Sequence, residues 1–375
     1  MNQPDGKSKA IFLFSQLSNI NFGVYCANPQ GLKDNLNNVT KIIEGKIEGF
    51  QKNVILQKIK SFWDREWQIV WGPCMKESIT KKSKQYPETV GTYHANNAMY
   101  VIKGGDAYVV GVAATNMLST FEQEVEDLDV FLQEPWNILN PNHGHISQGA
   151  KIGVEVLMDE LKDSHGRTLL QFLEETIRYN EPAEIITCGH SLGGALCPLV
   201  ALKIAERKHF LATWRNVSIS SYPTAAPVIG DSSFNNYVSD LSKSDKIYIN
   251  SMYNFNDIVP MAWQANTFGQ IPDAYIGFGV VPNTELKNTL NFLVAELKKV
   301  NHPYYRMYDI KECTFKAFPL EPTPQGDSAF MTEAMYQHIS VYYSEGFGFD
   351  SDFISHYNQF IQAILPRDCK TVIHH

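Results

Sequence analysis

The segment EIITCGHSLGGALCPLVALKIAERK, residues 184–208, decides how this chain of 375 residues is expected to fold. Its first five residues form a short apolar run rich in β-branched side chains, which is typical of a buried strand. Its last part, from Ala195 onward, is typical of an apolar helix. The turn Gly189-His190-Ser191-Leu192-Gly193-Gly194 therefore places a serine where a strand passes directly into a helix.

This context matters because a bare Gly-x-Ser-x-Gly pattern arises by chance in about an eighth of chains this long. A serine at a strand-to-helix turn has the geometry of a nucleophile elbow, and Gly189 and Gly193 leave room for its strained backbone. The N–H of Leu192, at the start of the helix, is then expected to stabilise an oxyanion. The alternatives are a glycine-rich turn with an incidental serine or a phosphate-binding loop, but neither G-x-G-x-x-G nor a Walker lysine is present.

The pattern around this turn predicts an α/β fold with a mostly parallel central sheet. Two strands are expected around a hairpin turn at residues 103–106, and further strands alternate with helices after Ser191. Apolar residues at three- and four-residue spacing predict helices over residues 36–50 and 53–71, which we interpret as a brace without chemistry.

The composition argues against several kinds of binding partner. The formal net charge of −8 argues against binding to nucleic acid and against electrostatic docking on anionic lipid, so a lipid would be met through local apolar surface. The six cysteines show no metal-binding spacing, and we expect them to be free thiols, which favours a reducing compartment. Without a convincing signal peptide or a membrane-spanning stretch, a soluble, cytoplasmic protein is expected, with signal-independent secretion as an alternative.

A nucleophilic serine needs a histidine to take its proton and a carboxylate to orient that histidine. In this fold the chain order is Ser, Asp, His. Asp257 follows a predicted strand and should emerge at the carboxyl edge of the sheet, although it could instead cap the turn before Pro260. The histidine can be any of three downstream residues: His302, His338 and His356.

The segment around Ser191 resembles the class 3 lipases, a family that includes filamentous-fungal triacylglycerol lipases. Residues 223–231 are similar to the T-F-G-x-P-R-V-G-[DN] segment of that family, and residues 254–260, Asn-Phe-Asn-Asp-Ile-Val-Pro, match its N-x-x-D-x-V-P. Residues 145–149 resemble its H-x-G-F stretch. The resemblance covers roughly residues 95 to 345, which suggests a helical N-terminal extension over residues 1–90 and a hydrolase domain over residues 91–375.

The resemblance implies roles for individual residues. Asp257 occupies the position of the triad aspartate, and His338, followed shortly by an aromatic residue, looks most like the triad histidine. Thr115 takes the place of the hydroxyl residue of the oxyanion hole, although the Arg and Gly that precede it in the family are absent. Residues 117–140 have the position of a lid helix, and an ordinary packed surface helix is the alternative.

We therefore expect a serine hydrolase that cleaves carboxylic esters by an acyl-enzyme mechanism, without a metal or organic cofactor. Lipid esters follow as the substrate class from the resemblance, together with transient contact with a lipid interface. Two alternatives stay open: a lipase-like scaffold that acts as a non-catalytic interaction module, and a phospholipase or acyltransferase that uses the same triad.

Overall fold

The computed structural model describes residues 4–47, 53–80, 87–114, 116, 130–137, 141–178, 181–209, 211, 214–244, 247–306 and 311–372. The strands are β1 (Val24–Cys26), β2 (Gln68–Ile79), β3 (Tyr93–Gly104), β4 (Ala107–Val112), β5 (Gln133–Pro135), β6 (His145–Ser147), β7 (Ala183–His190), β8 (Val217–Thr224), β9 (Tyr248–Asn254), β10 (Lys311–Phe315) and β11 (Cys369–Thr371). The helices are α1 (Gly6–Ser18), α2 (Pro29–Ile43), α3 (Val54–Phe62), α4 (Gln148–Glu155), α5 (Leu169–Thr176), α6 (Leu192–His209), α7 (Ser232–Lys243), α8 (Ala265–Phe268), α9 (Thr284–Leu297), α10 (Ala329–Met335) and α11 (Ser351–Ala363).

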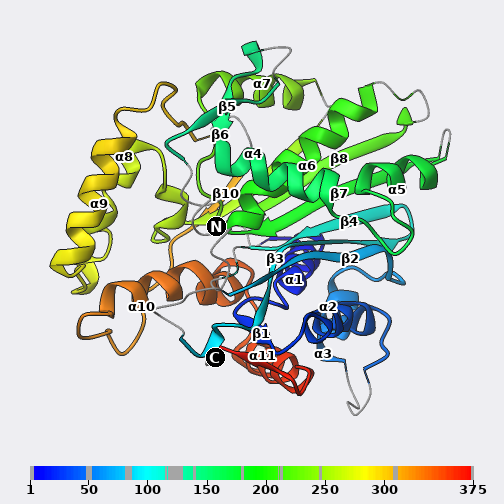
Figure 1. Ribbon diagram of the computed structural model, residues 1–375, viewed down its shortest axis with the longest axis horizontal. Helices are drawn as coiled ribbons and strands as arrows, with labels where there is room; N and C mark the ends of the chain where they lie inside the picture. Colours follow the sequence, from blue (N-terminus) through cyan, green and yellow to red (C-terminus); the bar gives the residue numbers. More distant parts are fainter. Residues whose placement is uncertain are drawn as a thin grey trace.

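The main sheet has the strand order β10-β9-β8-β7-β4-β3-β1-β11, and β2 also pairs with β3. The strands from β4 through β7, β8 and β9 to β10 are parallel, whereas the pairs that involve β1, β2 and β3 are antiparallel. The prediction of an α/β fold with a largely parallel central sheet is thus confirmed (Figure 1). The hairpin expected at residues 103–106 is present, with Gly104 opposite Ala107.

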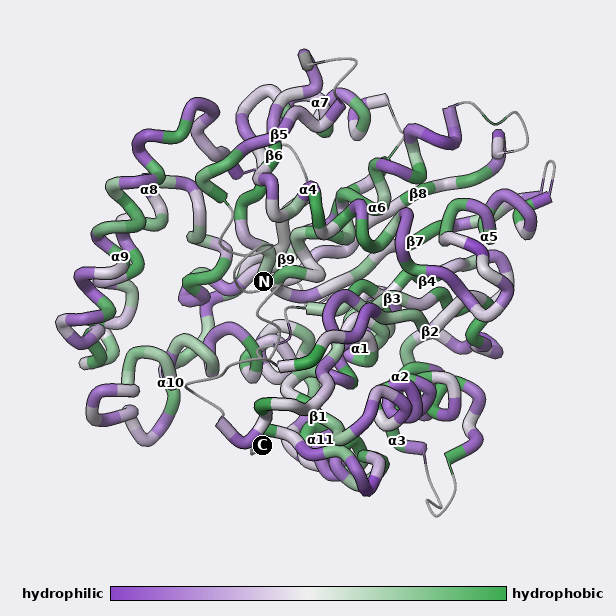
Figure 2. The backbone as a smooth tube through the Cα atoms, in the orientation of Figure 1, coloured by the Kyte–Doolittle hydropathy of each residue, from purple (hydrophilic) through white to green (hydrophobic). Residues whose placement is uncertain are grey.

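Helices cover both faces of the sheet because alternate residues of its strands point to opposite faces. In β7, Ile185 packs into the core with α4, α5, α6 and α7, while Ile186 packs into the core with α1, α2, α3 and α11. These two groups of helices lie on opposite sides of the strands in Figure 1. Figure 2 shows hydrophobic residues along the central strands and many hydrophilic residues on outer helices such as α2.

The helix expected over residues 53–71 is shorter than the sequence predicts. Helix α3 ends at Phe62, and the chain enters β2 at Gln68. Trp71 lies in this strand and is buried in the core. The apolar residues of this stretch satisfy a helical spacing, but pairing with β3 supplies the backbone hydrogen bonds there. The boundary near residue 90 stays a prediction, and residues on both sides of it contribute strands to one sheet.

A disulfide corrects the expectation that all six cysteines are free. Cys26 and Cys369 lie directly opposite each other in the antiparallel pair β1 and β11, and their sulfur atoms are bonded. Cys74, Cys188 and Cys197 are free and buried, as expected. Because disulfides persist in oxidising environments, the cysteines no longer support a cytoplasmic location. In the part of the chain that is described, no helix is long and apolar enough to cross a membrane.

Candidate active site

Ser191 lies at the sharp turn between β7 and α6, as the sequence predicts. Its φ is +57°, a left-handed conformation that is rare for residues other than glycine. A Cβ atom at Gly189 would lie 2.2 Å from the carbonyl oxygen of Gly193, and one at Gly193 would lie 2.4 Å from that of Val112. The backbone therefore approaches itself so closely at these two positions that glycine is required.

Backbone hydrogen bonds hold the serine in place. The N–H of Ser191 donates to the carbonyl of Thr224 at 3.0 Å, and the Ser191 carbonyl accepts from Ala195 N–H at 3.0 Å. Leu192 is the first residue of α6, so its N–H has no acceptor within the helix. This N–H therefore remains the candidate oxyanion donor that the sequence suggests.

Asp257 and His338 are in direct contact, although 81 residues separate them in the sequence. Asp257 follows β9 and is 1% exposed, and His338 lies in a π-helical turn, Tyr336–Ser340, that continues α10. The His338 Nδ1 atom lies 2.9 Å from Asp257 Oδ2. With the proton on Nδ1, the imidazole donates to the carboxylate and leaves Nε2 to accept a proton.

Two further groups fix this carboxylate. Asp257 Oδ1 accepts from the N–H of Val259 at 2.9 Å, and Oδ2 accepts from the hydroxyl of Tyr342 at 2.8 Å. Burial raises the pKa of Tyr342 well above its usual value, so its hydroxyl stays protonated and keeps donating. Tyr342 was not predicted from the sequence; its position four residues after His338 on a helical segment is the signal that points to it.

His190, the residue before Ser191, packs its ring against the ring of His338. Its ring centroid lies 4.8 Å from that of His338, and its Nδ1 atom lies 3.0 Å from Thr224 Oγ1. The Thr224 hydroxyl donates to the carbonyl of Gly189, so it accepts from His190 Nδ1–H. Burial lowers the pKa of His190 well below its usual value. The ring next to Ser191 is therefore neutral and places no second positive charge beside His338.

The other candidate histidines lie elsewhere. His356 is exposed on α11, and its Nδ1 atom contacts the carbonyl of Asp352 one turn earlier. His302 faces Asp231, with 3.5 Å between Nδ1 and Oδ2. Of the three histidines that the sequence left open, His338 is the one that contacts Asp257.

Thr115 lies outside the described residues, as do residues 117–129 and 138–140 of the expected lid, so both interpretations stay predictions. The backbone just before Thr115 is held by a hydrogen bond, because Ala114 N–H donates to the Asn19 side chain at 2.7 Å. The end of β4 also lies against the start of α6, where the Cβ built at Gly193 meets the carbonyls of Val112 and Ala113.

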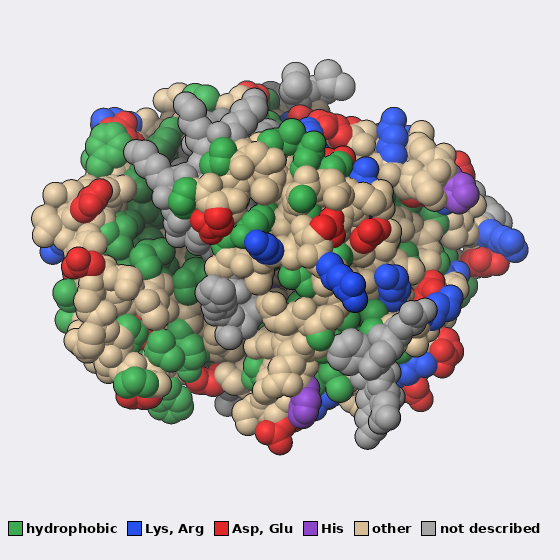
Figure 3. All heavy atoms as spheres, turned by 60° about the horizontal axis from the view of Figure 1, so that its bottom comes forward, with side chains coloured by type: hydrophobic (Ala, Val, Ile, Leu, Met, Phe, Trp, Pro, Cys, Tyr) green, Lys and Arg blue, Asp and Glu red, His purple; other side chains and the backbone are tan. Residues whose placement is uncertain are grey.

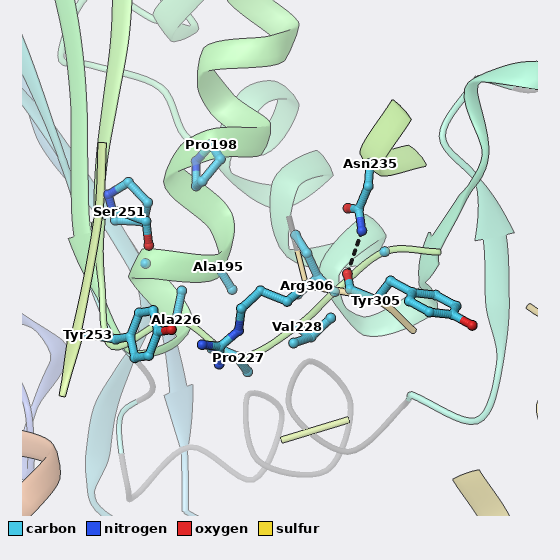
Figure 4. A pocket seen from close by; sticks show the side chains of 14 residues that line it. Ala195, Pro198, Ala226, Pro227, Val228, Asn235, Ser251, Tyr253, Tyr305 and Arg306 are labelled. Carbon is cyan, nitrogen blue, oxygen red and sulfur yellow. Dashed lines mark hydrogen bonds between the residues drawn. The ribbon is translucent and has the colours of Figure 1, made fainter. Parts of the chain in front are cut away.

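A pocket opens beside the first turns of α6 (Figure 4). In Figure 4 the Arg306 side chain extends toward Tyr253, and its guanidinium lies 4.2 Å from the centroid of that ring. The pocket is lined by Gly194, Ala195, Pro198, Pro223, Ala226, Pro227, Val228, Ile229, Gly230, Asn235, Ser251, Tyr253, Tyr305 and Arg306. Ser191, Asp257 and His338, all described, are not among these lining residues.

Solved structures of other proteins are similar to this chain. The chain is similar to the crystal structure of M37 lipase, with a TM-score of 0.65, 23% identity, and coverage of 94% of this chain and 99% of that chain. A lipase from Rhizopus microsporus var. chinensis is 15% identical, with a TM-score of 0.38 and coverage of 66% of this chain and 68% of that chain. No curated protein matches the sequence. At this identity, the likeness to M37 lipase shows the α/β-hydrolase fold. The family model for lipase (class 3) matches residues 109–266 of this chain, the segment that runs from β4 through the Ser191 turn to α8.

Proposed function

We propose that this protein hydrolyses carboxylic esters of lipids, with Ser191 as the nucleophile, His338 as the general base and Asp257 as the residue that orients the base. One observation carries the proposal: the 2.9 Å contact between His338 Nδ1 and Asp257 Oδ2. β7 and β9 run in the same direction, so Ser191 and Asp257 both follow strands at the carboxyl edge of the sheet. The ring of His190, the neighbour of Ser191, meets the ring of His338.

In the proposed mechanism, Ser191 Oγ attacks the ester carbonyl while His338 Nε2 takes its proton. The imidazolium that forms is stabilised by Asp257, and it then protonates the leaving alcohol. Water attacks the acyl-enzyme in a second step, with His338 again as the base, which releases the acid and frees Ser191. Leu192 N–H and Thr115 are the proposed oxyanion donors in both steps.

The family match supports lipid esters as the substrate class. The surface offers a second reason, because large apolar side chains are exposed around α9 and α10. Figure 3 shows apolar side chains on the part of the surface where these helices lie in Figure 1. The most exposed of these side chains are Ile276 (54%), Val281 (60%), Phe292 (63%) and Met331 (47%). Phe318, in the loop after β10, is 76% exposed. Exposed apolar surface of this kind suits contact with a lipid interface.

Labelling with a fluorophosphonate probe tests the nucleophile. The probe reacts only with an activated serine, so we expect one adduct on the intact protein, located at Ser191 by mass spectrometry. Ser191→Ala is expected to remove the adduct. If the folded wild-type protein remains unlabelled, with and without detergent, the hydrolase proposal fails and a non-catalytic scaffold becomes the better explanation.

A second prediction concerns the interface. Phe292→Ser and Phe318→Ser, made separately and together, are expected to lower activity on an emulsified long-chain triacylglycerol, by about tenfold for the pair. Activity on a soluble short-chain ester should not change, because neither residue belongs to the proposed triad. Val90→Ser is a matched control, since Val90 is also exposed (48%) but lies beside the short helical turn Pro87–Thr89. Equal losses on both substrates would contradict a role at the interface.

A further inference from the structure

Three side chains from distant parts of the sequence meet outside the proposed triad. His145 begins β6, Asp231 is the N-cap of α7, and His302 follows α9. The Nδ1 atoms of His145 and His302 lie 3.2 Å and 3.5 Å from the same oxygen, Asp231 Oδ2. The two imidazole rings stack with their centroids 3.6 Å apart and an interplanar angle of 14°.

These separations fit the ligands of one metal ion. The three ligand atoms all lie within 4.8 Å of one another. In a tetrahedral zinc site with bonds of about 2.0–2.1 Å, neighbouring ligand atoms are about 3.3 Å apart. The two distances to Asp231 Oδ2 are close to this value. Because a metal lies near the plane of each imidazole that binds it, an ion can bind all three atoms once the two stacked rings rotate apart.

The backbone holds the three segments together independently of any ion. Asp231 N–H donates to the carbonyl of His145 at 2.9 Å, and Tyr305 N–H donates to the carbonyl of Gly230 at 3.0 Å. Gly144, with a φ of +77°, packs so closely that a Cβ there would lie 2.0 Å from the nitrogen of Phe234 in the first turn of α7. The ligand set is thus preorganised by backbone contacts, as a metal site requires.

Neighbouring hydrogen bonds orient Asp231 and His302 so that their ligand atoms can reach an ion. Asp231 Oδ1 caps α7 by accepting from Phe234 N–H at 2.8 Å, so Oδ2 is the oxygen left to face the histidines. His302 is positioned by Gln133, whose side chain accepts from His302 N–H at 2.9 Å and donates to the His302 carbonyl. The Asp231 side chain is 7% exposed and that of His302 is 41% exposed, so a fourth ligand can reach the ion from solvent.

We propose that His145, Asp231 and His302 form a binding site for a divalent transition-metal ion, with zinc as the natural occupant and water as the fourth ligand. Two imidazoles and one carboxylate suit zinc, whereas calcium and magnesium prefer oxygen ligands. The ion joins β6, the start of α7 and the segment after α9. It takes no part in ester hydrolysis at Ser191, so this proposal does not depend on the proposed function.

Zinc binding to the full chain tests the site directly. Because His374 and His375 are adjacent and can themselves bind metal, both are first replaced by alanine, and the protein is treated with EDTA and dialysed. Titration calorimetry with Zn²⁺ is expected to give one site per chain. At about one hundred times Kd, zinc is expected to raise Tm by about 3 °C.

His302→Ala is the decisive variant, because this side chain is partly exposed and its loss should not disturb the fold. It is expected to weaken zinc binding by on the order of 100-fold and to remove the Tm shift. His145→Ala should behave in the same way, whereas His165→Ala, at an exposed position, should bind zinc like the parent. X-ray absorption at the zinc edge should report two imidazoles in the first shell.

Three outcomes would overturn the proposal: no binding of zinc by the parent, binding by His302→Ala with the parent's Kd, or an equal Tm shift with Ca²⁺. The last result would mean that the donor set does not select a nitrogen-preferring ion. Labelling of Ser191 is measured on the same samples. A failure of the metal site therefore stays separate from a failure of the hydrolase proposal.

Discussion

Ser191→Ala is expected to lower kcat for a soluble short-chain ester by about a million-fold. The hydroxyl is the atom that forms the acyl-enzyme in the proposed mechanism, and neither His338 nor the oxyanion donors can replace it. Residual hydrolysis would come from water attacking an ester that is held against the oxyanion donors. The measurement is a steady-state rate with the protein at high concentration, so that a slow reaction is still detected.

The control for this variant is its thermal unfolding, which shows whether the protein still folds. Serine and alanine have the same backbone restriction at a φ of +57°, so the substitution adds little strain at the turn. The variant should therefore unfold at nearly the same Tm as the wild type. A folded Ser191→Ala protein that keeps a tenth or more of the wild-type rate would show that the nucleophile is another residue.

Asp257→Asn is expected to lower kcat by about ten-thousand-fold, with a small change in KM. An amide cannot stabilise the imidazolium, and its NH₂ group can hold His338 in the tautomer with the proton on Nε2, which cannot accept the proton of Ser191. The loss should appear in the chemical step because Asp257 is buried behind His338 and does not face the substrate in our proposal.

Tyr342→Phe tests how much of the effect of Asp257 depends on the hydrogen bond that positions its carboxylate and how much on its negative charge. The variant removes one hydrogen bond to Oδ2 but keeps the carboxylate, so a loss of only up to about tenfold is expected. Asp240→Asn, at an exposed position on α7, is the control for the negative charge that Asp257→Asn removes. If Asp257→Asn costs no more than Tyr342→Phe, Asp257 is a structural residue of the turn and not the orienting acid.

The elbow could be predicted from the sequence because its determinants are local. An apolar strand, two glycines around a serine and an apolar helix lie within 25 residues, and the close contact between Gly189 and Gly193 is a property of that stretch alone. The contact between Asp257 and His338 depends on how β9 and α10 are arranged in space. Chain order and the family resemblance were needed to choose His338 among three histidines.

Other features had no local signal. Cys26 faces Cys369 only because β1 and β11 pair at the sheet edge, and nothing near either cysteine in the sequence indicates that pairing. The same holds for His145, Asp231 and His302, which lie 86 and 71 residues apart along the chain. The strand β2 was not predicted for another reason. Its pairing with β3 has register shifts on both sides of Gly72, so its apolar residues do not alternate strictly, and their spacing also fits a helix.

The Cys26–Cys369 bond turns most of this polypeptide into a covalent ring, because the two residues are 343 positions apart. A protease that cuts one loop inside the ring opens it without releasing a fragment. The pieces on either side of the cut stay tethered at the β1–β11 edge and held by the shared sheet. The Cys26–Cys369 bond therefore keeps the molecule in one covalent piece after a single cut in the backbone between these two residues.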